Sequence, residues 1–424
     1  MHASTIVRVP FCGLPCSPLR IDAIGAGGWT VAGGCGVARA AAGRAPDRGG
    51  PRVGGRPAGL DAALDRAAAI LAAARRPHVG GLAWSTIGAV RRAARIARRL
   101  GATLDIEGGS ATAAESEAIA IAGLASATFG AVRARADVVL LWRCDPLAEH
   151  PGLLPGRLPA AAGGGERRFV RLGAAGPAEP GDLEALAALR ALALGRAPHL
   201  AAAPPGTRAG GLPVEALRDA AAAVGATRHA AILWDAQAVN GPTGAAVALA
   251  LALLARDLND ARDHDDSRRA VARPLGGGGN IAGALAAVLS EVGHARDLGP
   301  VEGADALLLV GPRERGTAGA AAATPAAAAP AVAASAMAAP GSTTPAPVAG
   351  VVVIGPRLPE GREEPDVFLP TAVPGLSGGG LWMRADGIAL PVRDVVPRTA
   401  PLEEEILDAL TARLPDERGA GAPR

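Results

Sequence analysis

The sequence predicts an α/β protein made of two stacked units, each with a largely parallel sheet. Two observations predict this class. Short apolar segments with the length of buried strands alternate along the chain with longer amphipathic segments of helical period. Such alternation places helices on both faces of a parallel sheet. The 424 residues, of which 49% are hydrophobic, are enough for two or three domains with a sizeable core.

A small N-terminal domain is expected over residues 1–58. It contains Cys12, Cys16 and Cys35, and it ends in a linker rich in Gly, Pro and Arg over 43–58. Four cysteines in a chain of this length do not make a disulfide framework. This usage favours a reducing, cytoplasmic location.

The first α/β unit is expected over residues 59–210. Ser85 or Thr86 is expected to cap its second helix, and Gly101 is expected to end that helix. The predicted helices are 60–76 and 87–101, and the predicted strands are 78–85, 102–107, 137–142 and 167–173.

The second α/β unit is expected over residues 211–414. Asn280 is expected to cap one of its helices. Residues 317–349 are nearly all Ala, Pro, Gly, Ser and Thr, which predicts a low-complexity surface insertion, and 415–424 are expected to form a tail. The predicted helices are 213–225, 243–259, 280–293 and 402–414, and the predicted strands are 229–235, 304–311, 348–355 and 366–375.

The charge of the chain is nearly balanced, with a formal net charge of +3, and all 43 basic residues are arginine. The absence of Lys and Tyr is typical of a GC-rich genome, although arginine also suits the binding of carboxylates and phosphates. Interspersed acidic residues and an aromatic content of 2% argue against nucleic-acid binding. No transmembrane helix and no secretory signal is predicted.

Four stretches in the same order resemble one known family. They are "PFCGLPCSPL" (10–19), "FGAVRARADVVLLWRCDPLAEHP" (129–151), "PLGGGGNIAGALAAVLSEVG" (274–293) and "VFLPTAVPGLSGGGLWMRADGIALPVRDVV" (367–396). Together they resemble the B subunit of formylmethanofuran dehydrogenase, in the molybdopterin oxidoreductase superfamily. The resemblance covers nearly the whole chain and implies stacked Rossmann-like units behind the small cysteine-containing domain.

The resemblance also implies two different roles. In the archaeal dehydrogenase, the B subunit holds a [4Fe–4S] cluster and a molybdenum or tungsten bis-pterin cofactor. Methylotrophic bacteria carry a related formyltransferase/hydrolase complex, which moves a formyl group from formyl-tetrahydromethanopterin to a methanofuran-like carrier and then releases formate. In that complex the B subunit does no redox chemistry, and the catalytic sites lie in other subunits.

The family's cluster motif is C-x2-C-x3-C with a distal fourth cysteine. Cys12 and Cys16 match its second and third positions, and Cys35 matches the distal one. Val9 stands at the first position, where its side chain offers no ligand to iron. A vestigial cluster site is therefore expected, and the alternative is a labile cluster or another metal on three cysteines.

The family's molybdenum or tungsten ligand and pterin-phosphate loops are also altered. The loop expected over 105–116 has no cysteine, and Cys144 is interpreted as a small core residue. Arg143 stands where the family has Gly, and Asp145 replaces Asn, which adds repulsion toward a diphosphate. The Gly run with Asn at 276–280 fits an anion site at a helix N-terminus, or a plain turn with an Asn cap.

Other candidate residues point to no separate chemistry. The acidic stretch 259–269 is interpreted as a solvated loop, with a metal site as the alternative. It contains Asp260, Asp263, His264, Asp265 and Asp266. The remaining histidines considered, each isolated in sequence, are His78, His150, His229 and His294. The metalloprotease motif H-E-x-x-H does not occur.

The sequence thus favours a non-catalytic structural subunit of a formyltransferase/hydrolase complex, without an iron–sulfur cluster or molybdopterin. An active molybdenum or tungsten oxidoreductase subunit is the alternative. A stand-alone protein that binds a phosphorylated or polyglutamyl ligand is a third possibility. A further hypothesis is that Arg143 and Arg384 line a groove for the glutamate tail of the carrier; otherwise they are ordinary structural arginines.

Overall fold

The structure is a computed structural model of the whole chain, and it describes most but not all of the residues. The described residues are 4–7, 11, 13, 18–24, 28–43, 47, 49–106, 109–146, 153, 158, 167–261, 269–276, 279–293, 298, 303–312, 350–358 and 364–416, with the side chains of 4, 23, 24 and 109–114 left out. The insertion predicted at 317–349 and the last eight residues of the predicted tail lie outside this set.

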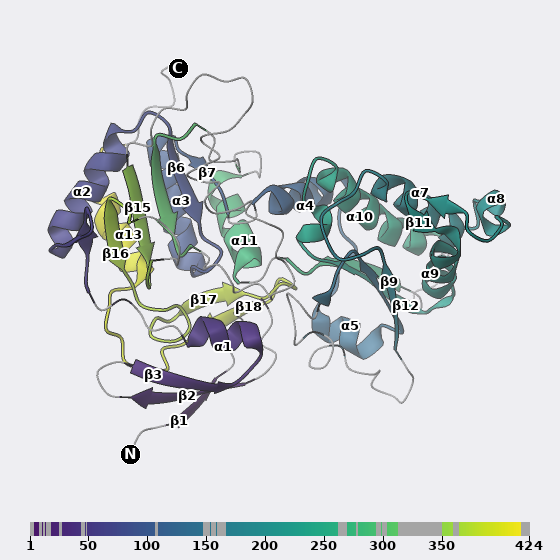
Figure 1. Ribbon diagram of the computed structural model, residues 1–424, viewed down its shortest axis with the longest axis horizontal. Coiled ribbons are helices and arrows are strands. Elements are labelled where there is room, and N and C mark those ends of the chain that lie inside the picture. The colour runs from purple at the N-terminus through teal and green to yellow at the C-terminus, as the bar shows by residue number, and fades with distance from the viewer. Residues whose placement is uncertain are drawn as a thin grey trace. The chain divides into compact units, whose positions relative to one another are not determined.

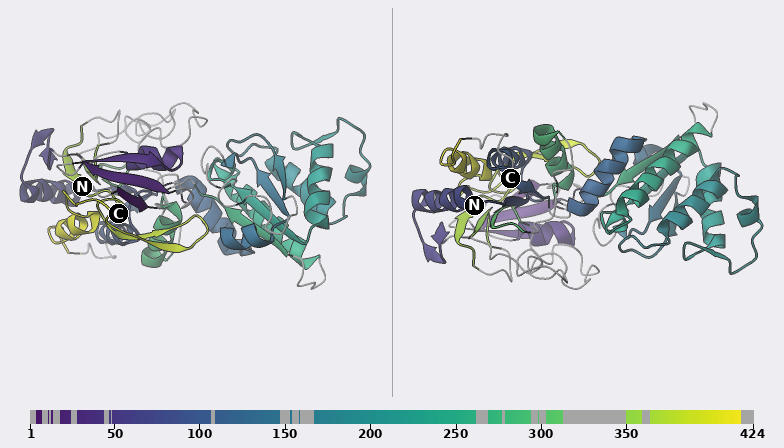
Figure 2. Two further views of the ribbon diagram at one scale, coloured as in Figure 1. Left: turned by 90° about the horizontal axis from the view of Figure 1, so that it is seen from below. Right: turned by 90° about the horizontal axis from the view of Figure 1, so that it is seen from above.

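The chain forms two compact units, and the first of them is discontinuous. Unit 1 consists of residues 1–109, 278–384 and 389–424, and unit 2 consists of residues 110–277 and 385–388. Both are mixed α/β structures with parallel sheets, which confirms the predicted fold class (Figures 1 and 2).

Unit 1 contains a seven-stranded sheet in the order β5-β4-β16-β15-β14-β6-β7, in which the strands from β16 to β7 run parallel. Its sheet strands are β4 (Arg52–Val53), β5 (Arg56–Pro57), β6 (Pro77–Gly81), β7 (Thr103–Leu104), β14 (Ala306–Val310), β15 (Gly350–Gly355) and β16 (Val367–Pro370). Its longer helices are α2 (Leu60–Ala73), α3 (Ile87–Leu100), α11 (Ile281–Val292) and α13 (Glu403–Thr411).

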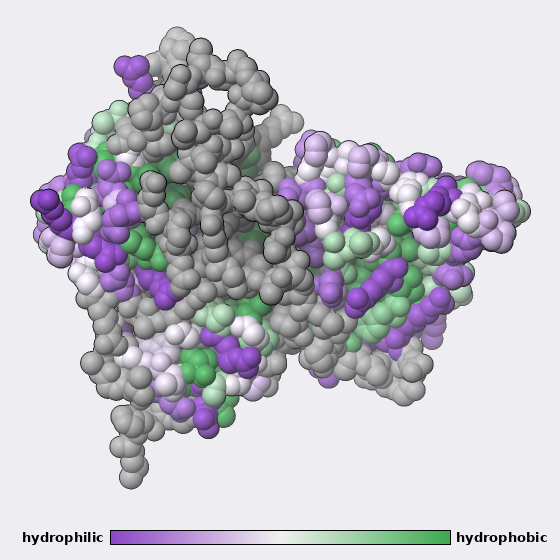
Figure 3. Space-filling view, in the orientation of Figure 1, coloured by the Kyte–Doolittle hydropathy of each residue, from purple (hydrophilic) through white to green (hydrophobic). Residues whose placement is uncertain are grey.

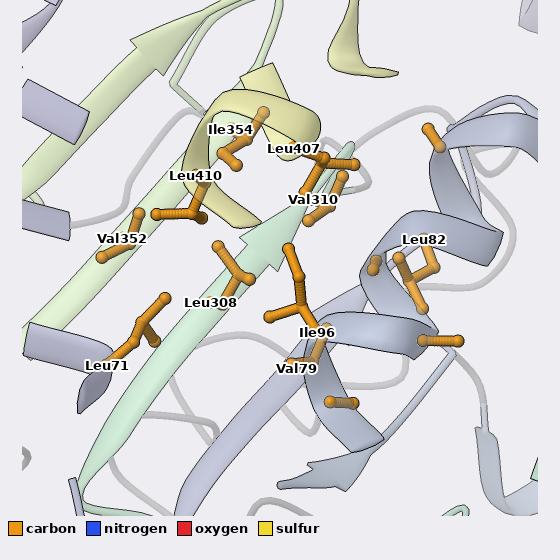
Figure 4. Packing of buried hydrophobic residues seen from close by; sticks show 14 of the residues in the cluster. Leu71, Val79, Leu82, Ile96, Leu308, Val310, Val352, Ile354, Leu407 and Leu410 are labelled. Carbon is orange, nitrogen blue, oxygen red and sulfur yellow. The ribbon is translucent and has the colours of Figure 1, made fainter. Parts of the chain in front are cut away.

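The main core of unit 1 lies between one face of this sheet and these four helices. Alanine-rich faces on α2 and α3 allow both helices to approach the sheet closely, and alanine also has the highest helix propensity. Figure 4 shows side chains from α2, α3 and α13 pointing toward the apolar residues of the central strands. The labelled ones are Leu71, Val79, Leu82, Ile96, Leu308, Val310, Val352, Ile354, Leu407 and Leu410.

The N-terminal segment packs on the same unit and does not separate from it. It contains a three-stranded antiparallel sheet and a short helix, and a two-stranded hairpin later in the chain packs with them around Trp29 and Trp382. These elements are β1 (Ser4–Val7), β2 (Leu19–Ile24), β3 (Gly28–Gly33), α1 (Gly36–Ala42), β17 (Gly380–Met383) and β18 (Ala389–Val392). The predicted separate domain over 1–58 therefore differs from the structure, because its apolar residues share one core with 373–396.

Unit 2 contains a four-stranded parallel sheet in the order β13-β12-β8-β9. Its main core lies under α7, α9 and α10, whose buried faces meet Trp142 and Trp234. The strands are β8 (Val138–Trp142), β9 (Arg168–Leu172), β12 (His229–Trp234) and β13 (Arg269–Pro274), with a small ladder of β10 (Arg208–Ala209) and β11 (Leu212–Pro213). The helices are α4 (Gly109–Ala122), α5 (Phe129–Arg135), α7 (Asp182–Ala193), α8 (Pro198–Ala201), α9 (Val214–Ala226), η2 (Gln237–Val239) and α10 (Gly244–Asp260).

The division into units differs from the predicted succession of 59–210 and 211–414. The reason is strand pairing, because β6 lies beside β14, so that Val79 pairs with Leu308. The first sheet is therefore completed only by strands that follow the whole of unit 2 in sequence.

Two helix ends test the cap predictions for α3. Thr86, not Ser85, is the N-cap, and its hydroxyl accepts the N–H of Ala89 at 3.2 Å. Gly101 ends the helix with a φ of 62°, as predicted.

The surface carries mixed side chains over both units. On the face shown in Figure 3, hydrophilic side chains alternate with apolar areas, as the nearly balanced charge of the sequence indicates. Within the described ranges, no helix has the length and hydrophobicity needed to cross a membrane.

Candidate functional sites at the carboxyl edges of the sheets

The strand order of unit 1 defines one candidate binding crevice. From β6 the chain proceeds to β7 on one side, whereas β14, β15 and β16 follow in turn on the other side. The order therefore reverses between β6 and β14. In doubly wound sheets, ligands bind outside the carboxyl ends of the strands at this switch point.

Unit 2 repeats the same arrangement with fewer strands. Here β9 lies on one side of β8, whereas β12 and β13 follow in turn on the other side. The switch point lies between β8 and β12, so the residues that follow these two strands form the second candidate site. They include Arg143, Cys144 and Asp235.

The backbone is unusual at the matching position of both switch points. Among the described residues other than glycine, only Leu82 and Arg143 have a positive φ, at 67° and 41° respectively. Leu82 directly follows β6 and Arg143 directly follows β8, which are equivalent strands of the two sheets. Strained backbone of this kind is concentrated at functional sites.

Arg143 is held by two acidic side chains. Its Nε donates to Asp182 at 2.7 Å and its Nη1 donates to Glu179 at 2.8 Å. Arg143 is 3% exposed and Asp182 is fully buried. The guanidinium is therefore a buried structural group at the end of β8, and it is not available to line a groove for a glutamate tail. This outcome supports the structural interpretation of Arg143 over the binding hypothesis.

A second buried polar group lies on the other side of the unit 2 switch point. Trp234 Nε1 donates to Glu115 at 3.1 Å, and burial together with nearby Asp235 raises the pKa of Glu115 to about 8. Asp235 accepts the N–H groups of Gln237 and Ala238 at the start of η2. These contacts order the loop after β12 around acidic groups.

Cys144 lies at the same edge and is buried, as its interpretation as a core residue requires. Burial raises the pKa of its thiol far above the ordinary value, and the charge of Asp235 raises it further. Because the thiolate is the reactive and metal-binding form, this environment disfavours nucleophilic and metal-binding chemistry at Cys144.

Of the Gly–Asn segment 276–280 before α11, the structure describes residues 276, 279 and 280, and the last two are bonded to other segments of unit 1. Gly279 N donates to Phe11 O at 2.9 Å, and Asn280 N donates to Ala83 O at 2.6 Å. Both donors are therefore used within the protein, which favours the plain turn over an anion site.

Asn280 itself does not cap α11 with its side chain, so the predicted capping bond is absent. The buried amide instead donates to Ser85 O at 2.7 Å and accepts Met383 N–H at 2.8 Å. It thereby fixes the start of α3 and the β17–β18 hairpin to the same point.

The structure describes only one of the residues predicted to belong to a cluster site. Val9, Cys12 and Cys16 lie outside the described residues. Cys35 is half-buried at the N-cap of α1, where its sulfur accepts Ala38 N–H at 3.4 Å. In the ranges that the structure describes, no group of three or more His, Cys, Asp and Glu side chains is arranged to hold a metal ion.

The segment expected as the metal-ligand loop is largely helical. Residues 109–116 of the predicted loop 105–116 form the first part of α4, which has no cysteine. Sequence inspection missed this helix because its Ala-rich start has almost no hydrophobic periodicity. Glu115 was missed with it, since its burial depends on contact with Trp234, which is far away in sequence.

The other candidates form no common site in the described part of the chain. His78 is buried in the core of unit 1 beside Thr103, and burial lowers its pKa to about 4. Asp260 ends α10, and Arg384 is half-buried directly after β17. His229 begins β12, whereas the predicted residues Asp145 and Cys144 follow β8. His150, Asp263, His264, Asp265, Asp266 and His294 lie outside the described residues.

The fold and its two switch points define a protein of two α/β units, each with an open parallel sheet whose strand order reverses at a candidate crevice. No protein-family profile matches the chain. The chain is similar to the B subunit of the formyltransferase/hydrolase complex Fhc from Methylorubrum extorquens, with 33% identity over 213 residues. The aligned part covers 46% of this chain and 52% of that relative, so it spans about half the length of the relative.

A solved structure extends the similarity to most of the chain. One chain of the crystal structure of the complex FhcABCD from Methylorubrum extorquens with methylofuran matches with a TM-score of 0.60. The match has 25% sequence identity and covers 86% of this chain and 98% of that one.

Proposed function

We propose that this chain is the B-type subunit of a formyltransferase/hydrolase complex that takes part in tetrahydromethanopterin-linked oxidation of formaldehyde to formate. The observation that carries the proposal is the structural match to a chain of FhcABCD over nearly the whole of both chains. The 33% identity to the B subunit of Fhc supports the same assignment. The partners are then the other subunits of the complex, and the carrier is of the methanofuran type.

We also propose that the chain is a scaffold without its own catalytic site, iron–sulfur cluster or molybdopterin, descended from the B subunit of a formylmethanofuran dehydrogenase. Two observations support this. At the unit 2 switch point, Arg143 forms an ion pair with Asp182 and is not available to a ligand. Asp235 and Glu179 add acidic groups there, which disfavour the binding of a diphosphate. The segment that supplies the metal ligand in the resembled family is here the cysteine-free helix α4.

An active molybdenum or tungsten subunit is the competing function, and the same observations argue against it. Without a thiolate on α4, the metal has no protein ligand of the type that the resemblance implies. Of the two arginines considered for the glutamate tail of the carrier, Arg384 is the one that stays a candidate, since Arg143 is buried and paired.

Assembly tests the proposal directly. The tagged chain is co-expressed with the A, C and D subunits of a formyltransferase/hydrolase complex from the same source, and the purified material is analysed by size-exclusion chromatography with mass determination. The expected result is one stoichiometric particle that contains this chain and releases formate from formyl-tetrahydromethanopterin. A monodisperse chain that elutes alone, beside a fully active complex of the other subunits, contradicts the proposal.

A further inference from the structure

The sheet of unit 2 has an open edge at β9. Its strand order is β13-β12-β8-β9, so β9 pairs with β8 on one side and with no described strand on the other. Two backbone hydrogen bonds show which residues of β9 face β8. At the start of the strand, Arg168 N donates to Asp137 O at 2.9 Å. At its end, Arg143 N donates to Leu172 O at 2.8 Å.

These two bonds fix the direction of the backbone groups along the strand. In a parallel pair, alternate residues of a strand bond to the same neighbour, so Arg168, Val170 and Leu172 bond to β8. The N–H and C=O groups of Phe169 and Arg171 therefore point away from β8. Among the residues that the structure describes, none forms a hydrogen bond with these four outward groups.

The side chains of β9 leave this edge accessible. Phe169 is 37% exposed, and Arg168 and Arg171 are exposed as well. Val170, in contrast, packs partly against the main core of unit 2 and holds the strand on the sheet. An exposed row of unpaired backbone groups of this kind is a template on which another strand can add.

The surface beside this edge is basic. Arg168 and Arg171 lie on β9, and Arg133 and Arg135 lie in the last turn of α5. That turn adjoins the start of β9, because Arg167 Nη2 donates to Arg133 O at 2.5 Å. The four arginines on β9 and α5 are exposed, and within the described ranges none of them forms an ion pair.

Arginines elsewhere in the chain are compensated. Arg92, for example, forms an ion pair with Asp408 at 2.7 Å. Asp137, which lies between α5 and β8, does not serve the basic surface in this way. It accepts the Thr227 hydroxyl and the His229 N–H on the side of β12, away from β9. The positive charge beside the open edge is therefore complementary to an acidic partner.

A second copy of this chain fits the edge poorly. In a two-fold pairing of β9 with itself, Arg168 and Arg171 of both copies would gather on one short ladder. Like charges on adjacent strands are destabilising. The same charges that disfavour self-pairing favour a strand that carries Asp or Glu.

We propose that the outer edge of β9 binds an extended acidic segment of another protein, which joins the sheet of unit 2 as a further strand. The backbone of that segment bonds to the N–H and C=O groups of Phe169 and Arg171, and its carboxylates lie near Arg168 and Arg171. This surface goes beyond the proposed scaffold role. It is formed by unit 2 alone and does not depend on which complex contains the chain.

Two short peptides test the proposal on the full chain. Both are about as long as β9 and have blocked ends; one alternates valine with glutamate and the other alternates valine with lysine. Calorimetry measures their binding. The glutamate peptide is expected to bind with a dissociation constant on the order of 1 mM or below. The lysine peptide is expected to bind at least about 10-fold more weakly, because its charges meet arginines. Equal binding of the two peptides, or no saturable binding of the glutamate peptide, overturns the proposal.

A pair of variants at Phe169 tests the backbone contact. Phe169→Pro removes an N–H that points away from β8, so the bonds between β8 and β9 are kept. The variant is expected to weaken binding of the glutamate peptide at least about 10-fold, because proline removes a donor and its ring lies where the added strand approaches. Phe169→Val keeps the donor and is expected to bind within about threefold of the parent. Circular dichroism and the unfolding midpoint establish that both variants are folded. Equal affinities of the two folded variants overturn the proposal.

A pair of charge reversals tests the electrostatic contact without altering the backbone. Arg171→Glu is expected to weaken binding of the glutamate peptide at least about 10-fold and to strengthen binding of the lysine peptide. Arg256→Glu is the matched control, since Arg256 is exposed on α10, which packs beside β13 at the other edge of the sheet. It is expected to bind both peptides as the parent does. An unchanged preference for the glutamate peptide in folded Arg171→Glu overturns the proposal.

Discussion

Arg143 Nε lies 2.7 Å from Asp182 Oδ1, and both residues are buried at the carboxyl end of β8. This pair uses a strained backbone position, since the φ of Arg143 is 41°. The ion pair and the strain lie at the switch point where a doubly wound unit would hold a ligand. In unit 2, the position where such a ligand would bind therefore holds a buried ion pair of the protein itself.

The stability of unit 2 should depend on this pair. Arg143→Ala leaves the carboxylate of Asp182 buried without a counter-charge and is expected to lower the free energy of unfolding by about 3–5 kcal/mol. Urea unfolding followed by circular dichroism measures the change. Glu179→Ala is the control: the side chain of Glu179 is 60% exposed, so its loss should cost no more than about 1 kcal/mol. Equal effects of the two variants would contradict the structural role of the pair.

Asn280 should be a second point of high sensitivity, in unit 1. Asn280→Ala removes the partners of Ser85 O and Met383 N–H, both of which bond to the buried amide. Leaving them unpaired is expected to cost about 2–4 kcal/mol of unfolding free energy. Ser290→Ala, in the same helix α11, should stay within about 0.5 kcal/mol of the parent. Denaturant titration of both variants distinguishes a structural amide from a residue without a structural role.

Buried Glu115 predicts the sign of a pH effect on stability. Its folded pKa of about 8 exceeds the ordinary value of 4.5, so the folded chain binds the proton more tightly than the unfolded chain does. The stabilisation is complete below pH 4.5 and is lost as the pH rises toward 8, with a slope of at most about 1.4 kcal/mol per pH unit.

Glu115→Gln should reduce this slope between pH 5.5 and pH 8, because glutamine keeps an acceptor for Trp234 but does not titrate. Exposed Glu117 lies two residues away on α4, and Glu117→Gln is the matched control. The measurement is the urea midpoint as a function of pH. A slope that is the same in the parent and in both variants would show that Glu115 does not stay protonated in the folded chain.

Metal content tests the proposed loss of the redox cofactors. With Val9 at one cluster position and a cysteine-free α4, the expected result is no stoichiometric iron, molybdenum or tungsten in anaerobically purified complex. Elemental analysis and pterin extraction measure this. About four irons per chain together with a pterin would show that the alternative, an active oxidoreductase subunit, is correct.

Arg384 carries the remaining prediction about the carrier. In the assembled complex, Arg384→Ala is expected to slow formate release from carriers with long glutamate tails and to leave short-tailed carriers unaffected, because a charged contact contributes about 1.5–3 kcal/mol. Arg393→Ala, an exposed arginine after β18, is the control. Identical rates for both tail lengths in both variants would leave the carrier contact to other residues.

The sequence allowed the fold class and most strands and helices to be predicted, because buried strands such as β8 and β14 are continuous apolar runs. Helix α3 was also predictable, since Thr86 and Gly101 mark its ends. Strand order was not predictable in the same way. Residues that pair across long separations, such as Val79 with Leu308, leave no local signal, and so the unit boundaries differed from the prediction.

The candidate sites were less accessible to sequence inspection than the fold. Arg143 was singled out as a departure from a family pattern, but its partner Asp182 was not, because the pairing is tertiary.

The interruption of unit 1 by unit 2 has a consequence for synthesis on the ribosome. Val79 and its partner Leu308 are more than 200 residues apart in the chain, so β14 is translated long after β6 and β7 have emerged. Unit 2, in contrast, is nearly complete in one continuous stretch, residues 110–277. Unit 2 can therefore fold while the half-built sheet of unit 1 exposes an unpaired strand edge, the kind of surface that chaperones protect. Nascent chains stalled near residue 300 should be richer in bound chaperone than the full-length chain after its release from the ribosome.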